Sequence, residues 1–202
     1  MRAVIIGNGN ISDNEYILSK IKNDDYIICA DGGYNNAQKM GLKADVLIGD
    51  LDSALNVCDD IKIIKYPARK NFTDGELCIE YAIENGYDDI LLLGMTSHRI
   101  DHTINNILMM CGCKNACMVD EYNEIYLVKD KLVIENKKGY TLSIIPINGD
   151  SEGIVTTGLE YPLCYETLQF GKCRGNSNVI NDDLCKISIE KGMCIVVVSN
   201  GE

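Results

Sequence analysis

Short polar motifs in the first half of the chain carry acidic side chains at spacings that suit cation binding. They are Ala30-Asp31-Gly32-Gly33-Tyr34-Asn35, Ile48-Gly49-Asp50-Leu51-Asp52-Ser53, Asn71-Phe72-Thr73-Asp74 and Arg99-Ile100-Asp101-His102. Carboxylates gathered in one place repel one another by roughly 4 kcal/mol per pair at about 4 Å and an effective dielectric of about 20. Because such a cluster usually needs a cation, the motifs predict a metal-dependent site for a charged ligand.

Asp50 and Asp52 form the sharpest of these motifs. Residues i and i+2 of an extended segment point the same way, so both carboxylates can face one ion. Mg²⁺ favours one or two carboxylates together with waters and phosphate oxygens. The structural alternative is an Asp-containing turn in which Ser53 caps a helix. The position of the pair at the end of an apolar run favours metal binding.

Two other acids have equally good structural explanations. Thr73 suits a helix N-cap, and an acid at Asp74 in the first turn suits the helix dipole. Asp31 could end a strand and begin a turn, while the following Gly32-Gly33 would let the backbone approach a ligand closely. If the motifs follow parallel strands, both acids lie at the carboxyl edge of the sheet, where ligands bind.

The motif Arg99-Ile100-Asp101-His102 precedes a helical pattern. An arginine is suited to bidentate recognition of phosphate, and a helix N-terminus attracts anions. Asp101 could instead only cap the helix, and a lone histidine is more often structural than catalytic. Gly7-Asn8-Gly9 resembles the start of a dinucleotide fingerprint, but position 12 is Ser12 and no Walker phosphate loop is present.

The elements that must position these motifs alternate in type over the first 120 or so residues. Strands are predicted at 3–7, 26–30, 46–49, 61–66, 90–93 and 116–119. Continuously apolar runs such as 90–93 are typical of strands covered on both faces. Helix starts are predicted at Ser12 with Glu15 and at Thr73 with Glu76, both at capping-box spacing. The alternation predicts an α/β fold: a mostly parallel sheet with helices on both faces.

After about Tyr122 helical periodicity is essentially absent. Short strands are predicted at 132–135, 140–145, 154–157, 186–190 and 193–199, separated by turn residues. This texture predicts a smaller all-β domain, a sandwich or a partial barrel. We therefore divide the chain into an α/β domain over residues 1–122 and a β domain over residues 123–202.

Composition limits the function classes. The formal net charge of −11 argues against a nucleic-acid surface, which needs clustered lysine and arginine. It does not exclude a single nucleotide that binds together with Mg²⁺. No signal-peptide pattern opens the chain and no apolar run approaches about 20 residues, so no membrane association and a cytoplasmic location are expected.

Taken together and in order, the motifs resemble the thiamine pyrophosphokinase (thiamine diphosphokinase) family. The resemblance also includes Asn106 and two segments of the second half, Thr157-Gly158-Leu159-Glu160-Tyr161-Pro162-Leu163 and Gly175-Asn176-Ser177-Asn178. It implies an N-terminal nucleotide domain, a C-terminal β-sandwich, and a homodimer with thiamine sites at the subunit interface. The chain departs from the family pattern at Asn71, at Ser97-His98 and in its lack of tryptophan.

The resemblance implies transfer of pyrophosphate from ATP to thiamine, with the release of AMP. It implies that Asp50, Asp52 and Asp74 bind Mg²⁺. It also implies that Arg99 neutralises the negative charge that develops on the phosphates. It also implies an ATP pocket and a thiamine site. The ATP pocket would include Asp31, Gly32, Asn35, Thr73, Arg99, Asp101 and His102, and the thiamine site would include Ser177 and Asn178.

Two other functions stay open at this stage. A magnesium-dependent phosphohydrolase or simple kinase could use the same acids, and it would release phosphate or ADP instead of AMP. A non-catalytic nucleotide or thiamine sensor would bind without turnover, and Asn71 together with Ser97-His98 favours that alternative. The nucleotide product formed with and without thiamine separates all three.

Overall fold

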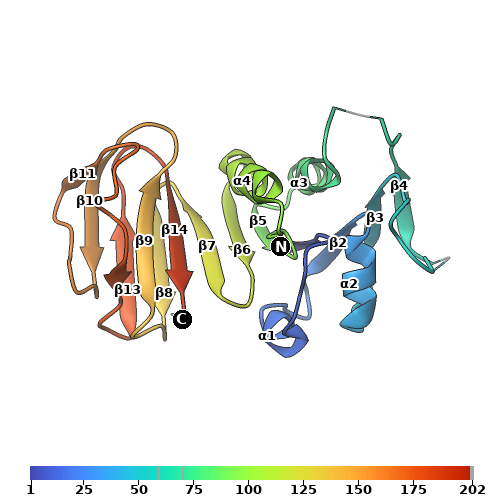
Figure 1. Cartoon of the computed structure of the whole chain (residues 1–202), viewed down its shortest axis with the longest axis horizontal. Helices are drawn as coiled ribbons and strands as arrows, with labels where there is room; N and C mark the ends of the chain where they lie inside the picture. The colour runs from blue at the N-terminus through green and yellow to red at the C-terminus, as the bar shows by residue number, and fades with distance from the viewer. Residues whose placement is uncertain (59, 70, 201–202) are drawn as a thin grey trace. The chain divides into compact units, whose positions relative to one another are not determined.

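The computed structural model describes residues 1–58, 60–69 and 71–200 (Figure 1). The chain divides into two compact units, the first over Met1–Glu121 and the second from Tyr122 onward. Each unit has its own hydrophobic core. The two units are therefore described separately.

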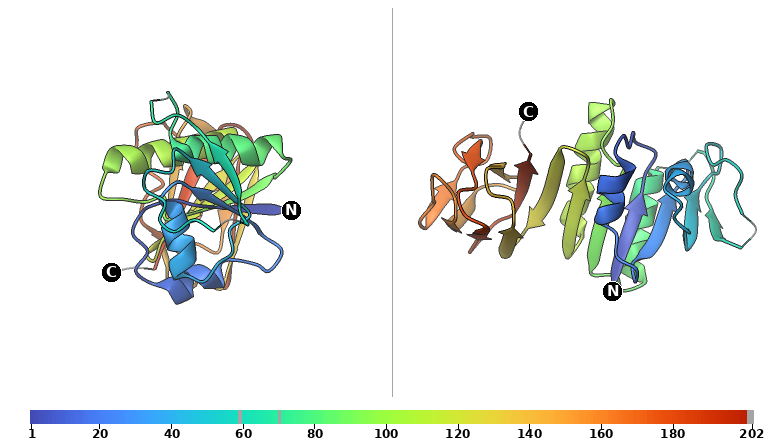
Figure 2. Two further views of the ribbon diagram at one scale, coloured as in Figure 1. Left: turned by 90° about the vertical axis from the view of Figure 1, so that its right-hand side faces the viewer. Right: turned by 90° about the horizontal axis from the view of Figure 1, so that it is seen from below.

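The first unit is built on a parallel sheet. Its strands are β1 (Arg2–Ile6), β2 (Tyr26–Ala30), β3 (Val46–Gly49), β4 (Lys62–Lys65), β5 (Asp89–Leu93) and β6 (Asn115–Val119). They lie in the order β6-β5-β1-β2-β3-β4, side by side in the right-hand view of Figure 2, and every pair is parallel. The chain moves outward from β1 to β4 and then returns to β5 on the other side of β1. This reversal creates a switch point between β1 and β5, where ligands of open α/β sheets bind.

Helices cover both faces of this sheet. They are α1 (Asn14–Ser19), α2 (Gly33–Lys39), α3 (Asp74–Glu84) and α4 (Ile100–Met109), followed by the short 3₁₀ helix η1 (Met110–Gly112). In Figure 1, α1 and α2 lie on one face and α3 and α4 on the other. Because both faces are covered, the inner strands are largely apolar, as in β3, where all four residues are buried. The predicted α/β architecture is confirmed.

Two helix starts show how local sequence sets the boundaries. The Thr73 hydroxyl oxygen accepts a hydrogen bond from the Glu76 amide at 3.1 Å, which confirms the predicted start of α3. The predicted capping box at Ser12 is wrong. Asp13 caps α1 by accepting from the Tyr16 amide at 2.9 Å, because Glu121 engages both the amide and the hydroxyl of Ser12.

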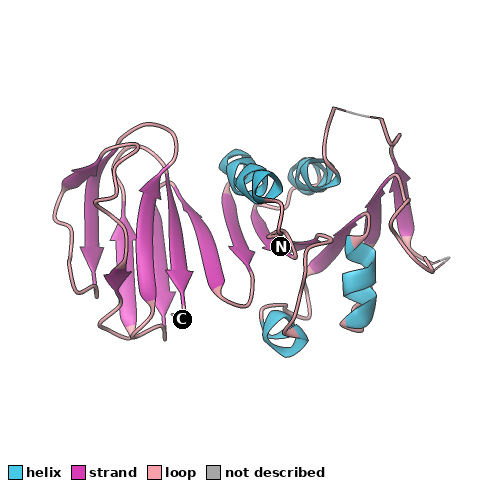
Figure 3. Cartoon of the chain, viewed as in Figure 1, coloured by secondary structure: helices cyan, strands magenta, loops and turns pink. Residues whose placement is uncertain are grey.

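The second unit is antiparallel. Its strands are β7 (Asn123–Val128), β8 (Lys131–Glu135), β9 (Thr141–Pro146), β10 (Ser151–Thr157), β11 (Glu166–Leu168), β12 (Asn178–Val179), β13 (Leu184–Ser188) and β14 (Cys194–Ser199). They form two antiparallel layers, β12-β9-β14-β7 and β11-β10-β13-β8, and Figure 3 shows only strands and loops in this part of the chain. Buried side chains from both layers, such as Leu142, Val196, Ile154 and Ile187, share one core. This is the expected sandwich.

Strand β7 was not predicted from the sequence, because a charged residue interrupts its apolar pattern. Glu124 is only 5% exposed, yet its carboxylate is satisfied. Lys137 Nζ lies 2.8 Å from one carboxylate oxygen, and the Tyr126 hydroxyl donates to the other at 2.5 Å. Burial of an acid in a strand is tolerable when it is paired in this way, and the pairing depends on tertiary contacts.

Candidate functional site

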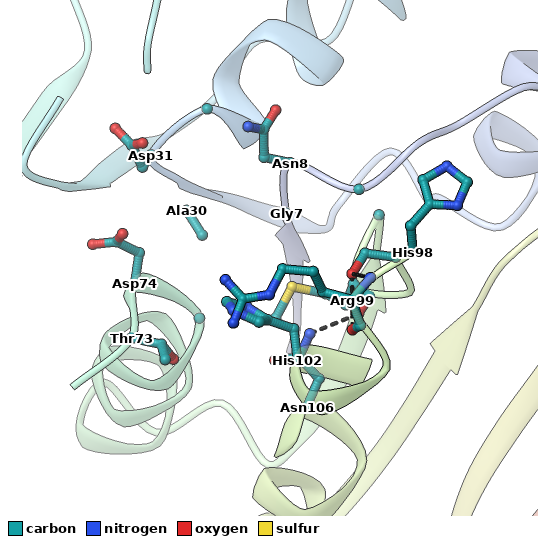
Figure 4. A pocket seen from close by; sticks show the side chains of 16 residues that line it. Gly7, Asn8, Ala30, Asp31, Thr73, Asp74, His98, Arg99, His102 and Asn106 are labelled. Atoms are coloured by element: carbon teal, nitrogen blue, oxygen red, sulfur yellow. Dashed lines mark hydrogen bonds between the residues drawn. The ribbon is translucent and has the colours of Figure 1, made fainter. Parts of the chain in front are cut away.

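A cleft of about 600 Å³ opens at the carboxyl ends of the strands in the first unit. Its walls come from segments that follow β1, β2 and β5 and from the starts of α3 and α4, so the cleft lies at the switch point of the sheet (Figure 4). The lining residues are Gly7, Asn8, Gly9, Ala30, Asp31, Gly32, Thr73, Asp74, Gly75, Gly94, Met95, Ser97, His98, Arg99, His102 and Asn106. The volume of the cleft lies within the usual range of small-molecule binding sites.

Glycines make the floor of the cleft possible. A Cβ atom on Gly33 would lie 1.9 Å from the Ile6 carbonyl oxygen, and one on Gly9 would lie 2.3 Å from the Thr96 carbonyl oxygen. The loop after β1 is held from below by Asn36. Its buried side-chain amide donates to the carbonyl oxygens of Gly7 and Gly9, both at 2.9 Å. The loop Gly7-Asn8-Gly9 is thus held in place by Asn36 where it lines the cleft.

Three carboxylates meet beside this cleft. Asp31, Asp50 and Asp52 each place one oxygen so that the three atoms lie within 4.8 Å of one another. Asp31 is buried, Asp50 is half-buried and Asp52 is exposed. Repulsion between two charges at about 4.8 Å is on the order of 3 kcal/mol at an effective dielectric of about 20. The group consists only of oxygen donors, which suits a hard divalent cation such as Mg²⁺.

The structure brings Asp74 next to this group without making it a member. Gly49 separates the two, because a Cβ atom there would lie 2.8 Å from the Asp31 Cβ and 3.2 Å from Asp74 Oδ1. Asp74 occupies the first turn of α3 and lines the cleft. Asp50 and Asp52 therefore share one group with Asp31, and Asp74 lies near Asp31 across Gly49.

Asn35 does not line the cleft; it holds the loop that carries Asp50 and Asp52. Its side-chain nitrogen donates to the Ser53 carbonyl oxygen at 2.8 Å, and its oxygen accepts from the Leu55 amide at 2.9 Å. Within the loop, the Ser53 hydroxyl donates to Asp52 Oδ1 at 2.7 Å. The motif that contains Asp31 thereby positions the motif that contains Asp50 and Asp52.

Arg99, Asp101 and His102 occupy the start of α4. Arg99 extends across the cleft toward the side that bears Asp31 and Asp74, and His102 lies beside it (Figure 4). The Arg99 guanidinium binds the Asp101 carboxylate through two hydrogen bonds, and this contact lowers the pKa of Asp101 from its ordinary value. Asp101 is outside the cleft lining and acts on it through Arg99.

Ser177 and Asn178 belong to the second unit. Asn178 accepts from the Tyr161 amide at 3.1 Å and donates to the Tyr161 carbonyl at 2.7 Å. The Ser177 amide donates to the Ser143 hydroxyl at 3.0 Å. A small cavity of about 70 Å³ lies here, lined by Ile144, Tyr161, Leu163, Arg174, Gly175, Asn176 and Asn178. The two family-like segments of the second half therefore meet in space.

Several cleft residues escaped the sequence reasoning. Asn8, Gly75 and Met95 line the cleft, and Asn36 supports it. Asn8 belongs to Gly7-Asn8-Gly9, a motif that was seen in the sequence. The motif was set aside because the dinucleotide fingerprint is incomplete. Asn36 and Met95 have no local signature, because their roles arise from contacts with distant loops.

Among the helices that the structure describes, none is long and apolar enough to cross a membrane.

Comparison with known proteins identifies the family. The model of the thiamin pyrophosphokinase catalytic domain matches residues 17–119, and that of the thiamin pyrophosphokinase vitamin B1 binding domain matches residues 129–194. A thiamine pyrophosphokinase of Bacillus subtilis is 32% identical over 144 residues, which cover 66% of this chain and 65% of the relative. The aligned part thus spans just under two thirds of that relative. Thiamine pyrophosphokinase 1 of Oryza sativa is 24% identical over 200 residues, 82% of this chain and 76% of the relative.

Solved structures show the same fold. The crystal structure of thiamine pyrophosphokinase from Bacillus subtilis superposes with a TM-score of 0.87 at 23% identity, covering 98% of this chain and 99% of that one. The corresponding protein from Geobacillus thermodenitrificans gives a TM-score of 0.85 at 21% identity, covering 98% and 97%. The shared fold is an α/β unit followed by a β-sandwich unit.

The chain belongs to the thiamine pyrophosphokinase family, an enzyme family that transfers pyrophosphate from ATP to thiamine. The predicted family and fold class are confirmed.

Proposed function

We propose that this protein transfers the pyrophosphoryl group of ATP to the hydroxyethyl oxygen of thiamine and releases AMP and thiamine diphosphate. The observation that carries the proposal is that Asp31, Asp74 and Arg99 line one cleft at the switch point of a parallel sheet, with Asp50 and Asp52 beside Asp31. Opposite charges placed there can bind a polyphosphate together with its counter-ion. In this proposal residues 1–122 supply nucleotide binding and catalysis, and residues 123–202 supply thiamine binding and dimerisation.

The metal site of the proposal contains Asp50, Asp52 and Asp74. The residues fit Mg²⁺ because they offer only carboxylate oxygens, and because a buried oxygen of the neighbouring Asp31 has no hydrogen-bond partner. When bound, Mg²⁺ would supply positive charge that offsets the charge of the phosphates. The half-buried and exposed positions of Asp50 and Asp52 leave room for water and phosphate oxygens as further ligands.

The nucleotide pocket of the proposal uses the rest of the cleft. Gly32 and the neighbouring loop present backbone to the ligand, while Thr73 and His102 line its walls. Arg99 would bind phosphate oxygens in a bidentate manner and stabilise the charge that develops on them. Asn35 and Asp101 act indirectly. Asn35 holds the loop that carries Asp50 and Asp52, and Asp101 holds the Arg99 guanidinium.

The chemistry is an in-line displacement. The thiamine hydroxyl oxygen forms a bond to the β-phosphorus of ATP as the bond to the AMP oxygen breaks. In this proposal Asp74 orients the hydroxyl or accepts its proton; its position in the lining of the cleft supports this role. Reactions of this kind depend chiefly on positioning and charge stabilisation.

Thiamine binding is assigned to the segment with Ser177 and Asn178. The thiazolium of thiamine is cationic, and the protein has a net charge of −11, so long-range attraction favours the substrate. A homodimer with active sites at the subunit interface forms part of the proposal. It is supported by exposed apolar side chains along α4, namely Ile100, Ile104 and Leu108, each about half exposed or more. A cytoplasmic location and no association with nucleic acid or membrane complete it.

One assay tests the proposal. The protein is incubated with ATP, Mg²⁺ and thiamine, and the nucleotide product is identified by chromatography. AMP that appears only when thiamine is present, together with thiamine diphosphate, is the expected result. ADP or free phosphate would instead indicate a simple kinase or a phosphohydrolase, and bound nucleotide without any product would indicate a sensor.

A further inference from the structure

We infer that Asn36 is a positioning residue for the phosphates of the nucleotide, because it sets the orientation of the loop Gly7-Asn8-Gly9. Asn36 itself is outside the lining of the cleft, whereas all three residues of the loop belong to it. The inference deepens the proposed function, on which it rests for the identity of the ligand.

The first observation is the setting of the Asn36 side chain. Asn36 belongs to α2 and is only 8% exposed. Its side-chain nitrogen donates to the carbonyl oxygens of Gly7 and Gly9, both at 2.9 Å. An amide NH₂ group has two donors, and these two bonds use both of them. A buried side chain whose two donors bind the same loop fixes how the peptide groups of that loop are turned.

The second observation is the direction of these peptide groups. In a planar trans peptide the C=O and the N–H point in opposite directions. The Gly7 carbonyl oxygen points to Asn36, so the amide of Asn8 points away from Asn36. Within residues 1–58, 60–69 and 71–200, this amide donates no hydrogen bond to the protein. Since Asn8 lines the cleft, its amide is a backbone donor that a ligand there can use.

The rest of the loop is held from its other side. The amides of Gly7 and Gly9 donate to carbonyl oxygens at the end of β5 and just after it, at 2.8 and 2.7 Å. A Cβ atom on Gly32 would lie 2.6 Å from Asn8 Nδ2, so the Asn8 side chain packs directly on Gly32. With both sides held, the direction of the peptide between Gly7 and Asn8 depends on the hydrogen bond from Asn36.

The direction of a peptide matters for an anionic ligand. Each peptide unit carries a dipole of about 3.5 D, whose positive end is the N–H. A phosphate oxygen accepts a strong hydrogen bond from a backbone N–H, and a carbonyl oxygen in the same place would repel it. Asn36 keeps the carbonyl oxygens of Gly7 and Gly9 turned away from the ligand. Its loss should therefore weaken binding of the phosphates, while Arg99 on another wall of the cleft stays in place (Figure 4).

The test measures binding of α,β-methylene-ATP with Mg²⁺ to the full chain by calorimetry. This analogue cannot be cleaved at the bond that the proposed reaction breaks. We expect Asn36→Ala to weaken its binding at least about tenfold. Adenosine, measured by displacement of the analogue, carries no phosphate, so its affinity should change by no more than about twofold. In steady-state kinetics the KM for ATP should rise while the KM for thiamine stays within about twofold.

A loss of stability must be separated from a loss of positioning. Asn36→Ala leaves two backbone carbonyl oxygens without their donor, so its Tm should fall. Asp25→Asn is the matched control, because it also disrupts a buried contact of the first unit but lies outside the lining of the cleft. Its Tm should fall while its affinity for α,β-methylene-ATP stays that of the wild type. Asn36→Ser keeps one small donor, so it should bind with intermediate affinity, and it replaces Asn36→Ala if that variant does not fold.

Three results would overturn the inference. One is wild-type affinity for α,β-methylene-ATP in Asn36→Ala, or in Asn36→Ser where that variant is used. Another is an equal loss for adenosine and for the analogue, which would show that Asn36 shapes the whole pocket. The third is a loss in Asp25→Asn as large as that in the Asn36 variant, which would make instability the cause.

The two proposals can fail separately. If the wild type forms AMP and thiamine diphosphate but Asn36→Ala binds α,β-methylene-ATP normally, only the positioning role is wrong. If Asn36→Ala loses the analogue while the wild type gives no AMP with thiamine, the positioning role stands and the proposed reaction is wrong.

Discussion

The Arg99 guanidinium forms a bidentate pair with the carboxylate of Asp101, two residues further along the chain. Nε donates to one carboxylate oxygen at 3.2 Å and Nη2 to the other at 2.6 Å. Both side chains are well exposed, at 70% and 58%. The carboxylate therefore fixes the orientation of a cation that lines the cleft, although the pair itself adds little to stability.

This pair predicts non-additive kinetics. Arg99→Ala should lower kcat/KM for the nucleotide about 100-fold, equal to about 2.7 kcal/mol, because a cation next to the phosphates is lost. Asp101→Asn should cost about 3- to 10-fold, since Arg99 stays but is less well oriented. The double variant should match Arg99→Ala within about twofold. Steady-state kinetics over all four proteins measures the cycle, and full additivity would show that Asp101 acts independently of Arg99.

Removal of one metal carboxylate should stop turnover and spare the fold. Asp52→Asn is expected to lower turnover at least about 100-fold at saturating Mg²⁺, because the charge that holds the ion is reduced. Asp52 is exposed, so circular dichroism and Tm should be close to those of the wild type. The matched control is Asp88→Asn, which removes an exposed carboxylate paired with Lys114, outside the cleft, and should leave activity unchanged. Near-normal turnover in Asp52→Asn would remove Asp52 from the mechanism.

Gly49 should tolerate no side chain. Its added Cβ would lie 2.8 Å from the Asp31 Cβ, so Gly49→Ala must push apart the loops that carry the acids. We expect a loss of about 1–3 kcal/mol in the free energy of unfolding, measured in urea, together with a strong loss of activity. Gly112→Ala is the control, because nothing lies within 4 Å of its added Cβ. Equal behaviour of the two variants would contradict the close packing at Gly49.

The ion pair of Arg2 and Asp25 predicts how stability depends on pH. The Asp25 side chain is 1% exposed, and Arg2 contacts it at 2.9 and 2.6 Å. Burial by itself raises the pKa of Asp25, but hydrogen bonds from Arg2 and the Lys22 amide outweigh this effect, so the pKa lies below its ordinary value. A lowered pKa means that the stabilisation is complete above pH of about 4 and is lost as the pH falls through the folded-state pKa.

Asp25→Asn should therefore reduce the free energy of unfolding by about 1–3 kcal/mol at pH 7. The difference from the wild type should shrink as the pH falls below about 4, because the wild-type carboxylate then becomes protonated. Urea unfolding at pH 7, 5 and 3 measures this change. The exposed pair of Lys114 and Asp88 gives the comparison, since Asp88→Asn should change stability by less than about 1 kcal/mol at every pH. A gap for Asp25→Asn that stays constant from pH 7 to 3 would contradict the lowered pKa.

Much of the fold could be predicted from local sequence. The strands at Tyr26–Ala30 and Val46–Gly49 have the predicted bounds, because continuous apolar runs flanked by polar motifs report burial directly. Thr73 begins α3 as its type and spacing predict. Strand β7 was missed, since the partners that make buried Glu124 acceptable come from elsewhere in the unit. The start of α1 was misplaced by one residue for the same reason, a distant contact from Glu121.

The sequence by itself determined the kinds of chemical group present, their order along the chain, and the sheet edge at which they meet. Only the tertiary structure decided which acids come together. Asp31 and Asp50 are neighbours because parallel strands β2 and β3 end side by side and because two left-handed residues turn the carboxylates toward one another. Gly49 lies between Asp31 and Asp74. Distances of a few ångströms between segments far apart in sequence depend on packing, which no local pattern records.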